Sequence, residues 1–166
     1  MKIHLKAVLI VFLAVLCLAA LFMLDVLELP VIVFPSAYPA DFSIRYESSN
    51  IGEKIVLDTS EGIVERGGKT ASFTPDEAFL REIWTKILKT KLPSIHGYVT
   101  GNASDHPTLY EITCTMNGHT YKVTGTDPAG SAKRGCVHLS EFVRYIEQKL
   151  ETIPEFQTLP KGSWIE

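Results

Sequence analysis

The residues with the most chemical potential in this sequence are histidines, cysteines and an aspartate in its second half. Zinc and copper bind such side chains, and the candidates are His96, Asp105, His106, Cys114, His119, Cys136 and His138. Compact metal sites place their ligands at short, fixed spacings such as Cys-x-x-Cys, His-x-x-x-His or His-Glu-x-x-His, and the sequence contains none of these. We therefore predict solvated surface histidines and no metal site.

A cysteine nucleophile is a second kind of chemistry that the sequence could support. Cys136 lies just before an expected helix, and a helix N-terminus lowers the pKa of a nearby thiol. An imidazole from His138 or His106 could then act as the base. A buried structural cysteine needs no such arrangement, so we expect that role and predict no catalytic residue.

The same cysteine could instead pair with Cys114. Both follow the apolar N-terminal segment, in the part of the chain that would meet an oxidising compartment. Spacing in the sequence does not show whether their Cα atoms come within bonding distance. The sequence therefore leaves two outcomes open, a disulfide between Cys114 and Cys136 or two separate buried thiols.

The loop Asp127–Gly135 could bind an anion. Its Ser131 hydroxyl and the cations Lys133 and Arg134 precede an expected helix, whose N-terminal amides and dipole favour negative charge. The loop is not a Walker A loop, because the required Lys-Ser/Thr does not follow Gly135. An exposed connection between a hairpin and a helix is the expected role, with anion binding as a secondary hypothesis. We expect no cofactor.

An uncharged apolar stretch from Ala7 to Leu24 divides the chain. As a helix it would be roughly 27 Å long, close to the hydrocarbon thickness of a bilayer. Lys2 and Lys6 lie on its short side, so the positive-inside tendency places the N-terminus in the cytoplasm. We predict a cytoplasmic stub at 1–6, a transmembrane anchor at 7–29 in contact with the lipid bilayer, and all later residues outside.

A cleaved secretory signal is the alternative, and it would make the protein secreted. The apolar region of a signal usually has ~7–15 residues and ends at a small-x-small site. Here the small residues Cys17, Ala19 and Ala20 lie inside the stretch, with four more apolar residues after them. The length and the position of these residues favour a retained single-pass anchor.

Hydrophobic periodicity predicts an α+β domain at 41–152, between a Pro-rich tether at 30–40 and a C-terminal tail at 153–166. Apolar residues alternate with polar ones in several segments. Asn117-Gly118 marks a two-residue hairpin, whose register places Cys114 opposite Tyr121 and Ile112 opposite Val123. Apolar stripes of helical period follow Thr74, where a capping box is expected, and begin again at Leu139. We predict a two-layer sandwich, an antiparallel sheet of four to six strands with two helices on one face.

The charge distribution and the lack of catalytic motifs limit the classes of function to be expected. The net charge is −3 with acidic and basic residues interspersed, so there is no basic stripe for nucleic acid. With no catalytic constellation, we expect a membrane-anchored binding or accessory domain with a protein partner at the membrane surface. The alternative is an anchored or secreted enzyme or inhibitor. Its site would be built from the loops Ser94–Pro107 and Asp127–Gly135, which must then converge at one end of the sheet.

Overall fold

The computed structural model describes residues 10–19, 34–95, 98–102 and 104–161, and the chain divides into two compact units, residues 1–30 and 31–166. In the first unit, residues 10–19 form a helix whose side chains are all exposed, most of them large and apolar. Within the described ranges, no helix is both long enough and apolar enough to cross a membrane. The predicted stub and the rest of the predicted anchor, 7–9 and 20–29, lie outside the described residues.

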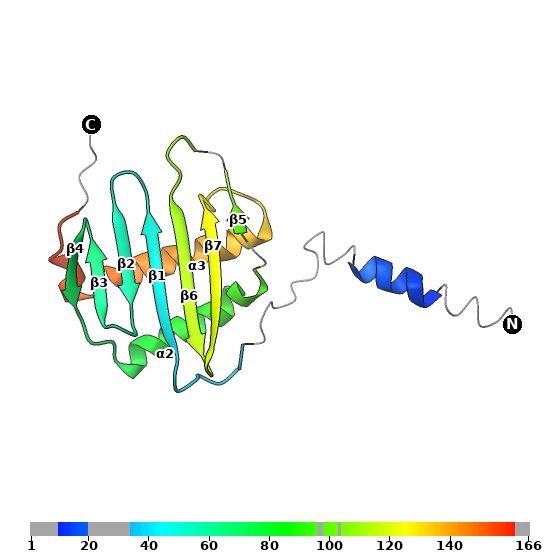
Figure 1. Cartoon of the computed structure of the whole chain (residues 1–166), viewed down its shortest axis with the longest axis horizontal. Coiled ribbons are helices and arrows are strands. Elements are labelled where there is room, and N and C mark those ends of the chain that lie inside the picture. Colours follow the sequence, from blue (N-terminus) through cyan, green and yellow to red (C-terminus); the bar gives the residue numbers. More distant parts are fainter. Residues whose placement is uncertain (1–9, 20–33, 96–97, 103, 162–166) are drawn as a thin grey trace, which may run out of the picture. The chain divides into compact units, whose positions relative to one another are not determined.

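The second unit is built on one seven-stranded sheet (Figure 1). Its strands are β1 (Ser43–Ser49), β2 (Lys54–Asp58), β3 (Ile63–Arg66), β4 (Lys69–Ser72), β5 (Tyr98–Thr100), β6 (Leu109–Met116) and β7 (His119–Thr126). They lie side by side in the order β4-β3-β2-β1-β6-β7-β5. All neighbouring pairs are antiparallel except β5 and β7, which are parallel.

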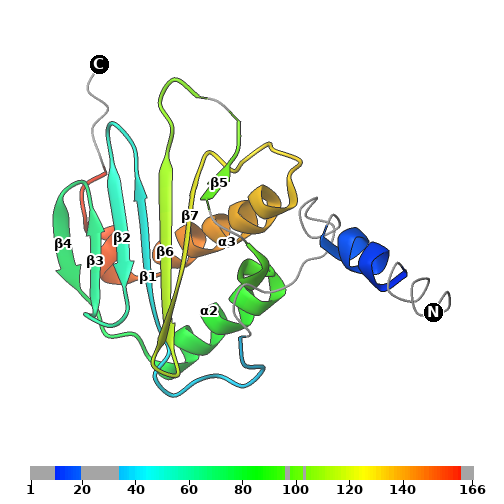
Figure 2. The same cartoon turned by 45° about the vertical axis from the view of Figure 1, so that its right-hand side comes forward.

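The helices cover one face of this sheet. They are α2 (Glu77–Lys89), α3 (Arg134–Leu150), the short α4 (Pro154–Gln157) and a 3-10 turn, η1 (Leu92–Ser94). Figure 2 shows α2 and α3 on the same side of the sheet, and no described helix of this unit lies on the opposite face. The α+β class was predicted correctly.

The predicted sheet was wrong in its strand number and in one orientation. It has seven strands rather than four to six, and it is mixed because β5 runs parallel to β7. β5 has only three residues within the long connection Ser94–Pro107, too few for an alternating pattern to stand out. Its parallel direction follows from the crossover: the chain leaves β4, passes along α2 behind the sheet and returns at the far edge.

Both helix starts also differ from the predicted positions. α2 is capped by Asp76, whose carboxylate accepts the amide of Phe79 at 2.7 Å, rather than by Thr74. Glu77, the expected capping partner, instead forms an ion pair with Arg81 one turn later. α3 begins at Arg134, before its apolar stripe. The sequence does not indicate this start, because Gly135 lies in the first turn and no side chain caps the helix.

Alternation along the strands decides which residues enter the core. In the β6–β7 hairpin, Asn117 and Gly118 have positive φ values of 49° and 71°, as a two-residue turn requires. The predicted register is confirmed: Cys114 lies opposite Tyr121 and Ile112 opposite Val123. These residues are buried against the apolar stripes of α2 and α3.

The segment before β1 packs on the domain. The Phe34 ring is stacked on Trp84, with 5.5 Å between centroids, and it meets Tyr121 edge-on at 5.0 Å. Tyr38 packs against Phe42, which is 4% exposed and itself meets Trp84. The described part of the predicted tether, residues 34–40, therefore contributes to the fold instead of acting only as a spacer.

Candidate functional site

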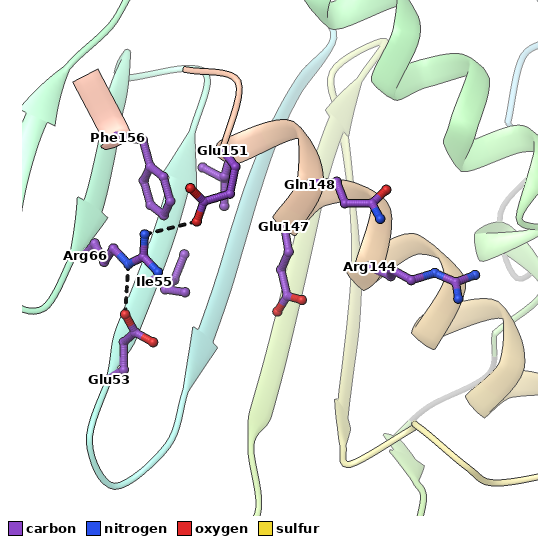
Figure 3. A pocket seen from close by; sticks show the side chains of 9 residues that line it. Glu53, Ile55, Arg66, Arg144, Glu147, Gln148, Glu151 and Phe156 are labelled. Carbon is purple, nitrogen blue, oxygen red and sulfur yellow. Dashed lines mark hydrogen bonds and ion pairs between the residues drawn. The ribbon is translucent and has the colours of Figure 1, made fainter. Parts of the chain in front are cut away.

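A groove opens on the helical side of the sheet, toward the β1–β2 turn and the β4 edge (Figure 3). Its volume is about 410 Å³. α3 contributes Arg144, Glu147, Gln148, Leu150 and Glu151, the sheet side contributes Glu53, Ile55 and Arg66, and α4 contributes Phe156. A concave site that combines apolar lining with a few polar groups is the usual form of a small-ligand site.

Arg66 closes one end of the groove. The register pairs it with Ile55, so alternation turns its side chain toward the helices. Its guanidinium forms ion pairs with Glu53 and Glu151, each at 3.0 Å, and lies 5.0 Å from the centre of the Phe156 ring. The arginine side chain is only 11% exposed. It is therefore part of the wall, with both of its charge partners supplied by the protein.

Glu147 lies in the middle of the groove and contacts the sheet. The buried hydroxyl of Tyr46 on β1 donates a hydrogen bond to Glu147 Oε1 at 3.1 Å. Burial raises the pKa of Glu147, the Tyr46 hydrogen bond opposes this rise, and the nearby Glu53 carboxylate adds to it. Burial and the charge of Glu147 also raise the pKa of Tyr46, so Tyr46 stays protonated as the donor.

Arg144 lines the groove one turn before Glu147. It is exposed, and among the described residues no carboxylate forms an ion pair with it. In Figure 3 the Arg144 and Glu147 side chains leave α3 in different directions. The groove thus offers a cation and a carboxylate that do not satisfy each other.

The two loops of the alternative hypothesis do converge at one end of the sheet. The Gly101 amide donates to the Thr126 carbonyl at 2.9 Å, and the Asn102 amide donates to the Asp127 carbonyl at 3.2 Å. Gly101 is required there, because a Cβ would lie 1.7 Å from the Asp127 carbonyl oxygen. These backbone hydrogen bonds hold the described parts of the two loops together.

The residues of the anion hypothesis are engaged by the protein itself. Lys133 is the N-cap residue of α3, and its Nζ donates to the Thr100 carbonyl at 3.3 Å. Ser131 Oγ accepts the Lys133 amide at 3.4 Å, although this amide would be one of the donors to an anion. Arg134 is exposed in the first turn. These contacts do not gather the three side chains around a common point.

Cys114 and Cys136 are both buried and both free in the structure. The disulfide is therefore absent, and of the two outcomes the structure has separate thiols. Burial raises the pKa of Cys114 to about 12. Cys136 lies in the first turn of α3, with its thiol 3.5 Å from the Thr100 carbonyl. Because Cys136 is fully buried, its thiol has no access to a substrate.

The histidines are spread over several elements. His119 begins β7, His138 lies in α3 and His106 lies in an exposed loop, while His96 lies outside the described residues. In the described part of the chain, no three His, Cys, Asp or Glu residues are grouped closely enough to hold a metal ion. Because His96 is undescribed, the absence of a metal site stays a prediction.

The groove residues were missed by the sequence analysis. Arg66 had one usable signal, since it occupies an inward position of the alternating strand Ile63–Arg66. Glu147 and Arg144 had no such signal in the sequence, because charged residues on an amphipathic helix usually face solvent. The chain matches no protein-family model, and no curated protein matches it significantly.

Proposed function

We propose that this protein is a single-pass, membrane-anchored binding or accessory module, with its N-terminus in the cytoplasm and its α+β domain outside. The binding site is the groove between α3 and the β2–β3 strands. The observation that carries this proposal is that one concave site holds the Glu147 carboxylate and Arg144, which has no ion-pair partner among the described residues. Charged groups that the fold does not satisfy can be satisfied by a bound molecule.

The apolar N-terminal segment supports the anchor. Its described part, residues 10–19, is a helix with every side chain exposed. A continuous apolar surface of this kind favours a lipid or protein environment over water. The uncharged sequence continues on both sides of this helix, from Ala7 to Leu24, which is enough residues for a span.

The anchor is tested by recovering the full-length chain from cell membranes after alkaline washing. We expect it to stay in the membrane fraction, with its original N-terminus detected by mass spectrometry. A protease added outside sealed cells should digest the domain. A soluble chain that starts near Asp41 would show that the segment is a cleaved signal and would contradict the anchor.

The binding site is tested by mapping amide chemical shifts of the isotope-labelled chain in detergent micelles. A cell extract is divided by ultrafiltration into small molecules and macromolecules, and each fraction is added. We expect shifts around Glu147 and Gln148, with the outer-face residues Lys122 and Thr113 as unaffected controls. The absence of groove shifts with both fractions would remove the groove as the binding site.

The second candidate is an anchored or secreted enzyme or inhibitor with a site at the converging loops. It is favoured by the contacts of Gly101 and Asn102 with the Asp127–Gly135 loop. The same mapping experiment separates the two. Shifts concentrated at Asn102 and Gly130, with none around Glu147, would support the loop site instead of the groove.

A further inference from the structure

Charge pairing inside the groove is uneven. Arg66 is held by two carboxylates, Glu53 and Glu151, and so needs no further partner. Arg144 has no ion-pair partner among the described residues, and the one hydrogen bond found there for the Glu147 carboxylate comes from a neutral hydroxyl. Among the described residues, one guanidinium and one carboxylate of the groove therefore have no ion-pair partner.

The fold keeps these two groups apart. Residues three apart on a helix are neighbours, so Arg144 and Glu147 could form an ion pair on the surface of α3. Instead, the Tyr46 hydroxyl holds Glu147 toward the sheet at 3.1 Å. Because Tyr46 is fully buried in the core, its hydroxyl is fixed in place. A ligand, rather than Arg144, is then left to supply positive charge to Glu147.

A ligand with a single charge would fit poorly. An anion on Arg144 would meet a groove that contains Glu53, Glu147 and Glu151, with only Arg66 to balance them. A cation on Glu147 would leave Arg144 unpaired in the same groove. A ligand with both charges would satisfy both residues and add no net charge to the site.

We propose that the groove binds a free amino acid, with its ammonium group on Glu147 and its carboxylate on Arg144. This proposal rests on the proposed function of the groove and names the class of its ligand. A guanidinium can donate two parallel hydrogen bonds to a carboxylate. An ammonium group donates three hydrogen bonds, and the Glu147 oxygen not used by Tyr46 is available to accept one of them.

The remaining lining suits the carbon skeleton of such a ligand. Ile55 is partly exposed and provides apolar surface, while Leu150 and Phe156, each 1% exposed, form the packed wall behind it. The Gln148 amide provides a donor and an acceptor. The volume of about 410 Å³ is near the lower end of the range for small-molecule sites. Partial burial and the Glu53 carboxylate disfavour negative charge at Glu147, so a bound ammonium group would stabilise the ionised carboxylate.

The test uses the full-length, isotope-labelled chain in detergent micelles and the proteinogenic L-amino acids, added one at a time. We expect at least one of them to shift amides around Arg144–Gln148 in a saturable way. For that amino acid, the N-acetyl derivative and the carboxamide derivative each lack one charge. Both should bind at least about tenfold more weakly, because each loses a charge-assisted interaction.

A variant links the effect to Arg144. Arg144→Gln should weaken the binding of the free amino acid about tenfold or more and leave the binding of the carboxamide derivative unchanged. Arg134→Gln, at the exposed start of the same helix, is the matched control and should bind like the unmodified chain. Circular dichroism confirms that each variant is folded.

Three results would overturn the proposal. If no amino acid shifts the groove amides but the small-molecule fraction of cell extract does, the ligand class is wrong and the groove keeps its binding role. If neither shifts them and the macromolecular fraction also fails, the proposed function fails as well. Equal binding of the free amino acid and its two derivatives would likewise exclude a zwitterion.

Discussion

The two ends of the sheet face that the helices cover carry different kinds of side chain. At the start of β1, the aromatic rings of Phe34, Phe42, Trp84 and Tyr121 pack on one another and close the core. Toward the β1–β2 turn, the layer between α3 and the sheet opens into a groove that is lined largely by charged side chains. Figure 1 shows the two ends: the β6–β7 turn lies at the bottom of the sheet and the β1–β2 turn at its top.

This difference separates stability from recognition. Buried aromatic contacts exclude water and add packing energy, but they leave no polar group for a ligand. Ion pairs at a groove add little net stability, because desolvation opposes their attraction. We therefore expect the aromatic end to contribute most to stability. At the charged end, we expect substitutions of residues without an ion-pair partner to change stability little. Four substitutions test this contrast, in order of decreasing effect.

The largest loss is expected from Trp84→Ala at the aromatic end. Trp84 is 3% exposed and its ring meets both Phe34 and Phe42, so its removal leaves a cavity in the core. We expect a decrease of about 3–5 kcal/mol in the free energy of unfolding. Urea denaturation followed by circular dichroism measures it. A decrease below about 1 kcal/mol would contradict the proposed role of the aromatic end.

Arg66→Ala should be next, since this arginine is the structural part of the charged end. Its loss leaves Glu53 and Glu151 without their cation and removes the contact with Phe156. We expect a decrease of about 1–3 kcal/mol in the free energy of unfolding. Lys122→Ala, which breaks the exposed pair with Glu111, is the control and should change stability by less than about 1 kcal/mol. Similar losses for both variants would show that Arg66 is not a structural element.

Phe34→Ala tests whether the segment before β1 is part of the domain. The ring is partly buried and contacts Trp84 and Tyr121, so we expect a loss of about 1–2 kcal/mol. Tyr98→Ala removes an aromatic ring that is 54% exposed on the opposite face of the sheet, and it should be nearly neutral. Equal unfolding midpoints for Phe34→Ala and the unmodified chain would show that residues 34–40 do act as a free tether.

The smallest effect on stability is expected from Glu147→Gln, within about 0.5 kcal/mol at neutral pH. Because the pKa of Glu147 is raised in the folded domain, its ionisation lowers stability as pH rises through the carboxyl range. Glutamine still accepts the Tyr46 hydrogen bond but does not ionise. The variant should therefore become more stable relative to the unmodified chain as pH rises above about 4.5. Thermal unfolding of both chains across this pH range measures the difference. A variant that becomes less stable relative to the unmodified chain as pH rises would contradict the prediction.

Local features of the sequence predicted much of the domain. Period-two alternation and the Asn117-Gly118 turn defined the β6–β7 hairpin and its register, which the structure confirms. The apolar stripes of α2 and α3 were also evident, and they placed both helices on one side of the sheet. The start of α2 was less well defined, because both Thr74 and Asp76 are good N-cap residues and only Asp76 accepts an amide hydrogen bond in the structure.

The sequence by itself determined the period of each long element and the uncharged stretch Ala7–Leu24, because both depend on neighbours within a few residues. The tertiary structure alone decided that Phe34 packs on Trp84, that β5 joins the edge of the sheet, and that Cys114 and Cys136 stay separate. It also brought Tyr46 to Glu147, which are 101 residues apart in the chain. Such contacts are set by how sheet and helices pack, and no local pattern records them.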